Sequence, residues 1–447
     1  MITIKKHNRK KWSPYIIIMI GFLSFIVVGT ALLLLPFSVN SGYTLNFVNA
    51  LYTATSSICV TGLSVVPDIG ATFSVFGKII IAILIQLGGL GFVTTTMFIF
   101  TLLGVKIGLN DRLLIRETLN QNTSRGLVRF VKKVIIMTFI FEFFGFLLNF
   151  VVFINEYSFL EAMGISAFHA ISSFNNAGFD ILGNSSLIGY SSNVLLLLNT
   201  SFLVIMGGMG FLVINDVLTK KSFKRLSLHS KIVIIMTFSL LTAGMLIIKL
   251  TEGSNISWLQ SFFQSVSART AGFTSVDYTT LRNSSLIITM FLMLVGASPC
   301  STGGGIKTTT LFVIISSIKS FITGKPPIVF YRKLSNDTVS RAYILTLLSL
   351  LLIFVFIFVL SITESANLQT NNMSLTQLSF EVVSAYATVG LSMGTTTLIS
   401  TTGRFIFCFI MFIGRLGPIT LISIINKNWN KTDDNSIIYP DGKIIIG

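Results

Sequence analysis

The sequence predicts an all-α integral membrane protein: four helix–pore-loop–helix repeats, with eight spanning helices plus four re-entrant pore helices, around a central pore. Composition is the first reason, because 52% of the 447 residues are hydrophobic and only 11% are charged. Charge distribution is the second, because no charged residue lies between Trp12 and Pro67 or between Ile79 and Val105. A bilayer core about 30 Å thick requires about 20 apolar residues per helix. The third reason is a glycine-centred segment that recurs four times.

Each recurrence, called a glycine segment below, has compact or hydroxylated residues before a Gly and a bulky apolar residue after it: Val60–Leu63, Asn176–Phe179, Thr270–Phe273 and Thr388–Leu391. Their glycines are 116, 94 and 118 residues apart, which indicates an internal repeat. The last segment begins with the first three letters of the potassium-channel filter sequence TVGYG, with Leu391 in place of Tyr. We therefore expect a selectivity filter formed by Val60, Thr61, Gly62, Asn176, Ala177, Gly178, Thr270, Ala271, Gly272, Thr388, Val389 and Gly390.

The glycines predict how this filter binds an ion. Gly tolerates backbone conformations that side chains forbid, so carbonyl oxygens can turn towards a common axis. Carbonyls from four loops would replace an ion's water shell, and the Gly kept in every segment favours potassium over sodium as the ion at the filter carbonyls. A short Ser-rich amphipathic stretch before each segment predicts a re-entrant pore helix: Leu51–Ile58, Phe168–Phe174, Phe262–Ala268 and Phe380–Tyr386. Extracellular loops are the alternative, but they would leave the fourfold recurrence unexplained.

Long apolar stretches alternate with the short ones, and each predicts a spanning helix: Pro14–Phe37, Phe76–Leu103, Val131–Ile154, Val194–Leu218, Ile232–Leu250, Ser285–Phe321 (interrupted), Ala342–Ile362 and Arg404–Ile425. The first stretch is too long and too apolar for a cleaved signal peptide, so we expect it to span the membrane. The predicted organisation is repeat 1 (1–104), repeat 2 (105–219), repeat 3 with a broken inner helix (220–324), repeat 4 (325–426) and a cytoplasmic tail (427–447).

The charged residues predict the orientation. Most of the 32 Lys and Arg residues fall on the side of the N-terminus, so the positive-inside rule places both termini in the cytoplasm. The net charge of +16 is then a topology signal and predicts no nucleic-acid binding. Acidic residues fall mainly on the opposite face, where carboxylates attract cations to an outer mouth. Asp180 and Asp277 are our candidates for that role, with ordinary solvated loop charge as the alternative for each.

A second glycine motif follows each glycine segment by 24 to 29 residues. It reads Gly88–Phe92, Gly207–Phe211 and Gly414–Pro418, and in the first two we interpret it as close helix packing. In repeat 3 the matching stretch, Gly296–Thr308, is too polar and too rich in Gly to stay helical. We expect it to break the inner helix below the filter and to plug the pore as a gate through Gly296, Ser298, Pro299, Ser301, Thr302, Gly303, Gly304, Gly305 and Lys307.

Arg415 is a charge near the middle of a predicted span. Such a charge costs on the order of 3 kcal/mol on insertion scales, so we expect it to face the interior and complete the gate by binding free carbonyls of the 296–308 loop. Snorkelling to the cytoplasm is the alternative. For Lys307, nearer the exit, a pore-facing position and an outward one stay equally open. Arg269, just before a glycine segment, is expected to brace that segment from behind.

Few residues suit catalysis. The three Cys and three His residues are scattered without metal-ligand spacing, and Glu142 is the lone acid within a span. We therefore expect no enzyme activity, no catalytic residue and no cofactor in this chain, with potassium, and possible sodium, as transported ions. A sodium-coupled secondary carrier of potassium or another monovalent cation is the alternative, because such carriers also combine Gly-interrupted spans with intramembrane Arg.

The filters, the Gly296–Thr308 insertion and the Arg in Gly414–Pro418 resemble the Trk/Ktr/HKT superfamily of potassium transporters. The chain is most similar to the bacterial Ktr-type membrane (ion-translocating) subunit. The resemblance implies a homodimer in the bacterial plasma membrane and a cytosolic nucleotide-binding regulatory ring, with nucleotide only on that partner. It also implies that the loop of repeat 3 is a gate held by Arg415. The basic stretches would dock the ring or bind anionic membrane lipids: Lys106–Lys133, Lys220–Lys231 and Lys319–Arg341.

Overall fold

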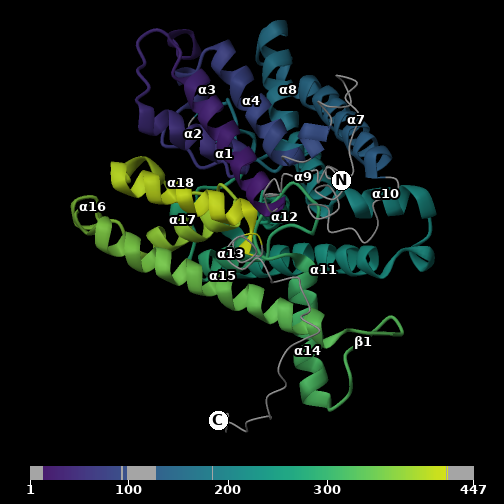
Figure 1. Cartoon of the computed structure of the whole chain (residues 1–447). Helices are drawn as coiled ribbons and strands as arrows, with labels where there is room; N and C mark the ends of the chain where they lie inside the picture. Colours follow the sequence, from purple (N-terminus) through teal and green to yellow (C-terminus); the bar gives the residue numbers. More distant parts are fainter. Residues whose placement is uncertain (1–13, 92–93, 98–126, 184, 419, 421–447) are drawn as a thin grey trace, which may run out of the picture.

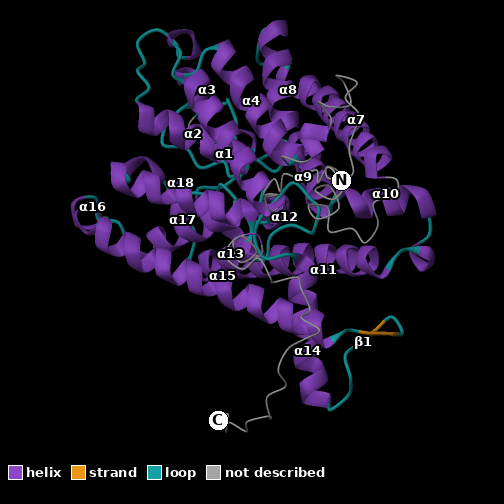
Figure 2. Ribbon diagram, in the orientation of Figure 1, coloured by secondary structure: helices purple, strands orange, loops and turns teal. Residues whose placement is uncertain are grey.

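The protein is a bundle of helices of very different lengths (Figures 1 and 2). A computed structural model describes the chain except for residues 1–13, 92–93, 98–126, 184, 419 and 421–447. One small antiparallel hairpin, β1 (Ile328–Val329) and β2 (Arg332–Lys333), projects from the bundle near α14 (Figure 2). The predicted cytoplasmic tail (427–447) and most of the basic stretch Lys106–Lys133 lie outside the described residues.

The helices of the first two predicted repeats are α1 (Pro14–Leu33), α2 (Phe47–Cys59), α3 (Ile69–Thr72), α4 (Val75–Leu90), α7 (Leu127–Phe153), α8 (Phe159–Phe174), α9 (Val194–Met209) and α10 (Phe211–Lys220). Those of the last two are α11 (Leu228–Glu252), α12 (Trp258–Ser267), α13 (Asn283–Leu294), α14 (Thr308–Thr323), α15 (Asn336–Thr363), α16 (Ser365–Thr370), α17 (Leu375–Ala387) and α18 (Thr401–Leu416). Short 3₁₀ turns connect them: η1 (Pro36–Ser38), η2 (Ile188–Tyr190), η3 (Phe223–Arg225), η4 (Gly253–Asn255), η5 (Tyr278–Thr280) and η6 (Thr396–Leu398).

The first helix of every predicted repeat is long and apolar enough to cross a membrane. These four are Tyr15–Leu33, Val128–Phe153, Leu228–Asn255 and Asn336–Thr363 among the described residues. Large apolar side chains stay exposed on their outer surfaces, such as Leu347 at 65% and Phe354 at 69% on α15. A helical membrane protein accounts for both facts, since lipid tails cover such faces.

The second helices are shorter than expected, because they break at glycine. The expected span Val194–Leu218 is not one straight helix: α9 and α10 meet at 96°, with Gly210 between them. Likewise α4 ends before Gly91 and α18 before Gly417. The three glycines have φ of 89°, 79° and 78° and ψ of 139°, 151° and 152°, a conformation open to Gly and closed to most side chains. The break expected only in repeat 3 therefore occurs in every repeat.

The short helices expected to be re-entrant begin before the Ser-rich stretches that predicted them. Capping explains their starts, because the side chains of Asn46, Ser257 and Ser374 accept hydrogen bonds from the first turns of α2, α12 and α17. In α12 and α17 a Gln completes a capping box. These caps satisfy backbone N–H groups that have no partner within the helix.

The short helices pack in a cyclic order. Each one contacts the second helix of the preceding repeat: α8 lies against α4, α12 against α9, and α17 against α13. The first, α2, lies against α18, the last helix of the chain to be described. Arg404 on α18 reinforces this closure by donating to the side-chain oxygen of Asn49 on α2 at 2.7 Å. The core of the protein is therefore a closed ring rather than a row of units.

Candidate functional site: a ring of four glycine segments

The four glycine segments meet end to end. A Cβ added to any of the four glycines would collide with a backbone carbonyl oxygen of the next segment, in the order Gly62 on Ala177, Gly178 on Ala271, Gly272 on Val389 and Gly390 on Thr61. The last contact returns to the first segment, so the segments form a closed ring. No side chain larger than hydrogen fits at these positions without moving backbone.

Two positive φ angles recur at matching positions in all four segments. The residue two before each glycine is left-handed, with φ of 56° at Val60, 59° at Asn176, 73° at Thr270 and 52° at Thr388. The glycines have φ of 91°, 69°, 81° and 96° in chain order. A non-Gly residue at positive φ costs on the order of 1–3 kcal/mol, so four in equivalent places indicate a conformation imposed by the surrounding packing.

Backbone hydrogen bonds anchor the segments to the re-entrant helices. The N–H before each glycine donates back to a Ser carbonyl: Thr61 to Ser56 (2.8 Å), Ala177 to Ser172 (2.8 Å), Ala271 to Ser267 (2.9 Å) and Val389 to Ser384 (2.9 Å). The hydroxyls of Ser56 and Ser384 also accept from the N–H of Gly62 and Gly390 at 3.1 Å. The hydroxyls of these two Ser residues thus have a structural role in α2 and α17.

The carbonyl oxygens of the ring remain available. Within the described residues, no protein group donates a hydrogen bond to the carbonyls of the four glycines or of the residues just before them. Buried carbonyls are almost always paired in proteins. A ring of unpaired carbonyls is what a site that binds a dehydrated cation requires.

The second glycine motif packs against the ring from outside. A Cβ at Gly88, Gly207 or Gly414 would collide with the carbonyl oxygen four residues before the ring glycine of the same repeat, on Ile58, Phe174 and Tyr386 respectively. The first Gly of each motif is therefore a close-packing position. The last Gly of each motif breaks the helix instead.

The 296–308 loop lies directly against the ring. A Cβ at Gly303 would collide with the hydroxyl of Thr270, and one at Gly304 with the hydroxyl of Thr388. The loop also bonds to the α9–α10 break: Ser298 N–H donates to Gly208 O at 3.0 Å, and Phe211 N–H donates to Cys300 O at 3.0 Å. The loop is thus wedged between the ring and repeat 2.

Two cationic side chains hold this loop. The Arg415 guanidinium donates to the carbonyl of Thr302 in the loop and to that of Gly88 in α4. The Lys307 ammonium donates to the carbonyl of Gly303 at 2.8 Å. Arg415 therefore points inward rather than snorkelling, and it joins parts of repeats 1, 3 and 4. Ser301 closes the turn within the loop by donating to Ser298 O at 2.6 Å.

The comparisons with known proteins agree on one family. Residues 3–431 match the TrkH family, described as cation transport protein. The chain belongs to the TrkH family. It is 38% identical to the Ktr system potassium uptake protein B of Bacillus subtilis and 36% identical to the potassium/sodium uptake protein NtpJ of Enterococcus hirae, each over 100% of both chains. The crystal structure of the potassium transporter TrkH from Vibrio parahaemolyticus has the same fold, with a TM-score of 0.73, 16% identity, and coverage of 95% of this chain and 87% of that one.

The two acidic candidates of this TrkH-family chain have different surroundings. Asp180 follows the second glycine segment, is half-buried, and accepts from Leu182 N–H at 3.3 Å. Burial raises the pKa of its carboxyl to about 6. Asp277 is exposed and caps η5, accepting from Thr279 N–H at 2.9 Å and from its hydroxyl at 2.7 Å. The role of Asp277 as the N-cap of η5 was not predicted from the sequence.

Arg269 lies behind the third glycine segment. It is 7% exposed, and its guanidinium donates at 3.4 Å to the carbonyls of Thr237 on α11 and Gly296 at the start of the loop. The side chain therefore contacts neighbouring backbone rather than the carbonyls of the ring.

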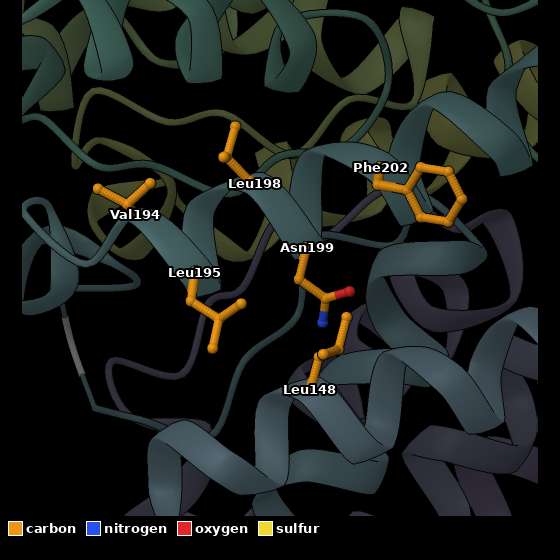
Figure 3. Close-up of a pocket in the computed structure, with 6 residues that line it drawn as sticks. All are labelled: Leu148, Val194, Leu195, Leu198, Asn199 and Phe202. Atoms are coloured by element: carbon orange, nitrogen blue, oxygen red, sulfur yellow. The ribbon is translucent and has the colours of Figure 1, made fainter.

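A shallow hollow between α7 and α9 lies apart from the ring. Figure 3 shows its lining, which is apolar except for Asn199: Leu148, Val194, Leu195, Leu198, Asn199 and Phe202. The Asn199 amide donates to Gly145 O at 3.0 Å and to the Asn149 side chain at 2.8 Å, so its polar group is satisfied within the protein. Such a surface suits a lipid chain and offers no ligands to an ion.

Proposed function

We propose that this protein takes up potassium passively through the ring of glycine segments. The observation that carries the proposal is the closed ring itself, with unpaired carbonyls supplied by all four segments. Several carbonyls acting together replace the hydration shell of a monovalent cation. A negative-inside potential supplies about 2.3 kcal/mol per 100 mV to each entering charge, so accumulation requires no other energy source.

Two further facts support potassium as the ion. Every segment keeps its Gly, which leaves the ring symmetric in backbone and free of intruding side chains. The relatives in Bacillus subtilis and Enterococcus hirae are named for uptake of potassium and of potassium/sodium, respectively.

The 296–308 loop is proposed to act as the gate. Its Gly303 and Gly304 lie against the ring hydroxyls, where they obstruct passage, and Arg415 and Lys307 stabilise it there through its carbonyls. Opening requires the loop to leave these partners.

The gate is proposed to respond to a cytosolic partner. Relatives named as parts of a Ktr system support a multi-subunit assembly. We infer a homodimer in the plasma membrane, with both termini cytoplasmic, that docks a nucleotide-binding ring on basic stretches such as Lys220–Lys231 and Lys319–Arg341. Anionic lipids are the competing ligands for that charge.

A sodium-coupled carrier is the second candidate, and the name of the Enterococcus hirae relative favours it. Four ring segments and one closed set of carbonyls support the pore instead. The two differ in that a carrier moves potassium only together with sodium.

The test is potassium and sodium flux into liposomes that contain the full-length protein, under an imposed inside-negative potential, with and without the cytosolic partner. Gly62→Ser and Gly390→Ser insert a side chain against the carbonyls of Ala177 and Thr61, so we expect sodium flux to approach potassium flux. Gly164→Ser is the matched control, because this glycine lies on α8 with open space around it. Unchanged selectivity in both ring variants would remove these segments from the filter, and potassium flux that requires sodium would establish the carrier.

A further inference from the structure

The residue three before the ring glycine differs in every repeat. It is Cys59 in repeat 1, Asn175 in repeat 2, Arg269 in repeat 3 and Ala387 in repeat 4. Asn175 is fully buried, and its side chain extends away from the ring into the space between α4 and α7. It immediately precedes Asn176, the residue with the left-handed turn of the second segment.

Three acceptors surround the amide nitrogen of Asn175. They are the side-chain oxygen of Gln86 on α4 at 2.8 Å, a carboxyl oxygen of Glu142 on α7 at 3.0 Å, and the carbonyl of Ile171 on its own helix at 2.9 Å. Glu142 is 6% exposed, so its hydrogen bond to Asn175 lies in an environment that excludes water. Hydrogen bonds in such surroundings are strong, and leaving an acceptor unpaired there is costly.

The backbone at Gly89 packs against the oxygen side of the Asn175 amide. A Cβ at Gly89 would collide with the side-chain oxygen of Asn175, so any larger residue displaces the amide. Gly89 is the second glycine of the motif Gly88–Phe92, between the packing position Gly88 and the helix break at Gly91. The Asn175 side chain is therefore confined by hydrogen bonds on one side and by backbone on the other.

The confinement of Asn175 reaches the ring through its neighbour. The Asn176 side-chain amide and the Thr270 hydroxyl of the third segment are hydrogen-bonded at 3.1 Å. Displacing Asn175 moves the left-handed turn at Asn176 and with it this cross-segment bond. This bond joins the second and third segments, beside the backbone contact of Gly178 with Ala271.

We propose that Glu142 and Gln86 are positioning residues that set the ion selectivity of the ring by holding Asn175, and through it the second glycine segment. The proposal rests on the ring being the filter. It assigns a function to Glu142, the lone acidic residue of α7, which belongs neither to the ring nor to the 296–308 loop. Neither residue touches the ion; each acts through the amide of Asn175.

The test compares acceptor-preserving and acceptor-deleting variants of the full-length protein. Glu142→Gln keeps a side-chain oxygen for Asn175, whereas Glu142→Leu keeps the volume and removes the acceptor. We expect the ratio of potassium to sodium uptake to fall at least tenfold in Glu142→Leu and to stay within about twofold of the wild-type ratio in Glu142→Gln. Gln86→Leu removes the second acceptor and should lower the ratio as well, which keeps the proposal testable if Glu142→Leu does not fold.

A double-mutant cycle separates positioning from a general loss of stability. If Glu142 acts through Asn175, Glu142→Leu should change the ratio little in the Asn175→Leu background. Glu252→Leu is the matched control, because Glu252 is a buried carboxylate that accepts from Arg282 N–H at 2.9 Å and makes no hydrogen bond to the ring. Its unfolding temperature should fall while its ratio stays unchanged.

The outcomes are separable from those of the filter test. Folded Glu142→Leu protein with the wild-type ratio would overturn the proposal, as would full additivity with Asn175→Leu. If Gly62→Ser changes the ratio and Glu142→Leu does not, the filter stands and the positioning proposal falls. If Gly62→Ser also leaves the ratio unchanged, both fall together.

Discussion

At the scale of single residues, Arg415 is the side chain that links the 296–308 loop to α4. Its two hydrogen bonds join the loop carbonyl of Thr302 to the α4 carbonyl of Gly88, and both acceptors belong to broken helices. Hydrogen bonds from a charged donor contribute about 1.5–3 kcal/mol each. A cation at this depth also repels an ion that reaches the loop.

Replacing Arg415 should therefore open the pathway. We expect Arg415→Gln to raise potassium flux through the protein alone about tenfold, the change produced by removing about 1.4 kcal/mol from the closed state. Arg341→Gln is the control, because Arg341 pairs with Asp337 on the exposed first turns of α15 at 3.1 Å. Liposome flux without the partner is the measurement; equal flux in Arg415→Gln and wild type would mean that Arg415 does not hold the gate.

Asp180 predicts a pH dependence. Burial, aided by the charge of Asp68, raises its pKa to about 6, so its carboxyl is charged above that pH and neutral below it. Lowering the pH from 7 to 5 removes this charge and should reduce potassium entry at low ionic strength. We expect Asp180→Asn to have low entry at both values, and Asp277→Asn, at an exposed cap, to keep the wild-type pH profile. A wild-type profile in Asp180→Asn would exclude this carboxyl as the cause.

At the scale of elements, the broken inner helices combine two uses of glycine in one motif. The first Gly lets the helix approach the carbonyl end of a re-entrant helix, and the last Gly ends it. The break in repeat 2 also supports the 296–308 loop. Backbone groups of Gly207, Gly208 and Phe211, at or near this break, form hydrogen bonds with that loop.

The three breaks supply a matched set of variants. Gly91, Gly210 and Gly417 share one backbone conformation, but only a Cβ at Gly210 would collide with the loop, at the Pro299 carbonyl, while the other two have open space. Alanine at each should cost on the order of 1–3 kcal/mol in backbone strain, lowering the unfolding temperature similarly. Only Gly210→Ala should also raise partner-independent flux. Equal flux in all three variants would show that the α9–α10 break does not support the loop.

Sequence reasoning reached the main elements but not their contacts. The glycine segments, the loop at Gly296 and the inward-pointing Arg415 have local signatures: a spaced repeat, a polar run in an apolar stretch, and a charge in a predicted span. The helix break at Gly210 has no separate signature, because packing and breaking glycines look alike in one dimension. The Asn175–Glu142 bond joins residues 33 apart on different helices, which no local pattern encodes.

At the scale of the whole molecule, the four predicted repeats contact one another around a closed ring. Every re-entrant helix packs on an inner helix of the preceding repeat, and every ring glycine contacts the following segment, so each repeat touches both neighbours. Disturbance in one segment therefore reaches the others through backbone contacts. This connectivity is the physical reason why single substitutions at Gly62 or Glu142 are expected to change the selectivity of the complete ring.

The contact between α2 and α18 has a consequence for how the protein is made. The ribosome synthesises the chain from its N-terminus. Asn49 is therefore made 355 residues before its hydrogen-bond partner, Arg404. The packing of α2 on α18, with this hydrogen bond, can form only after α18 has been synthesised. The proposed gate, its hydrogen bond to Arg415 and the proposed filter are therefore complete only when this last described helix has been made.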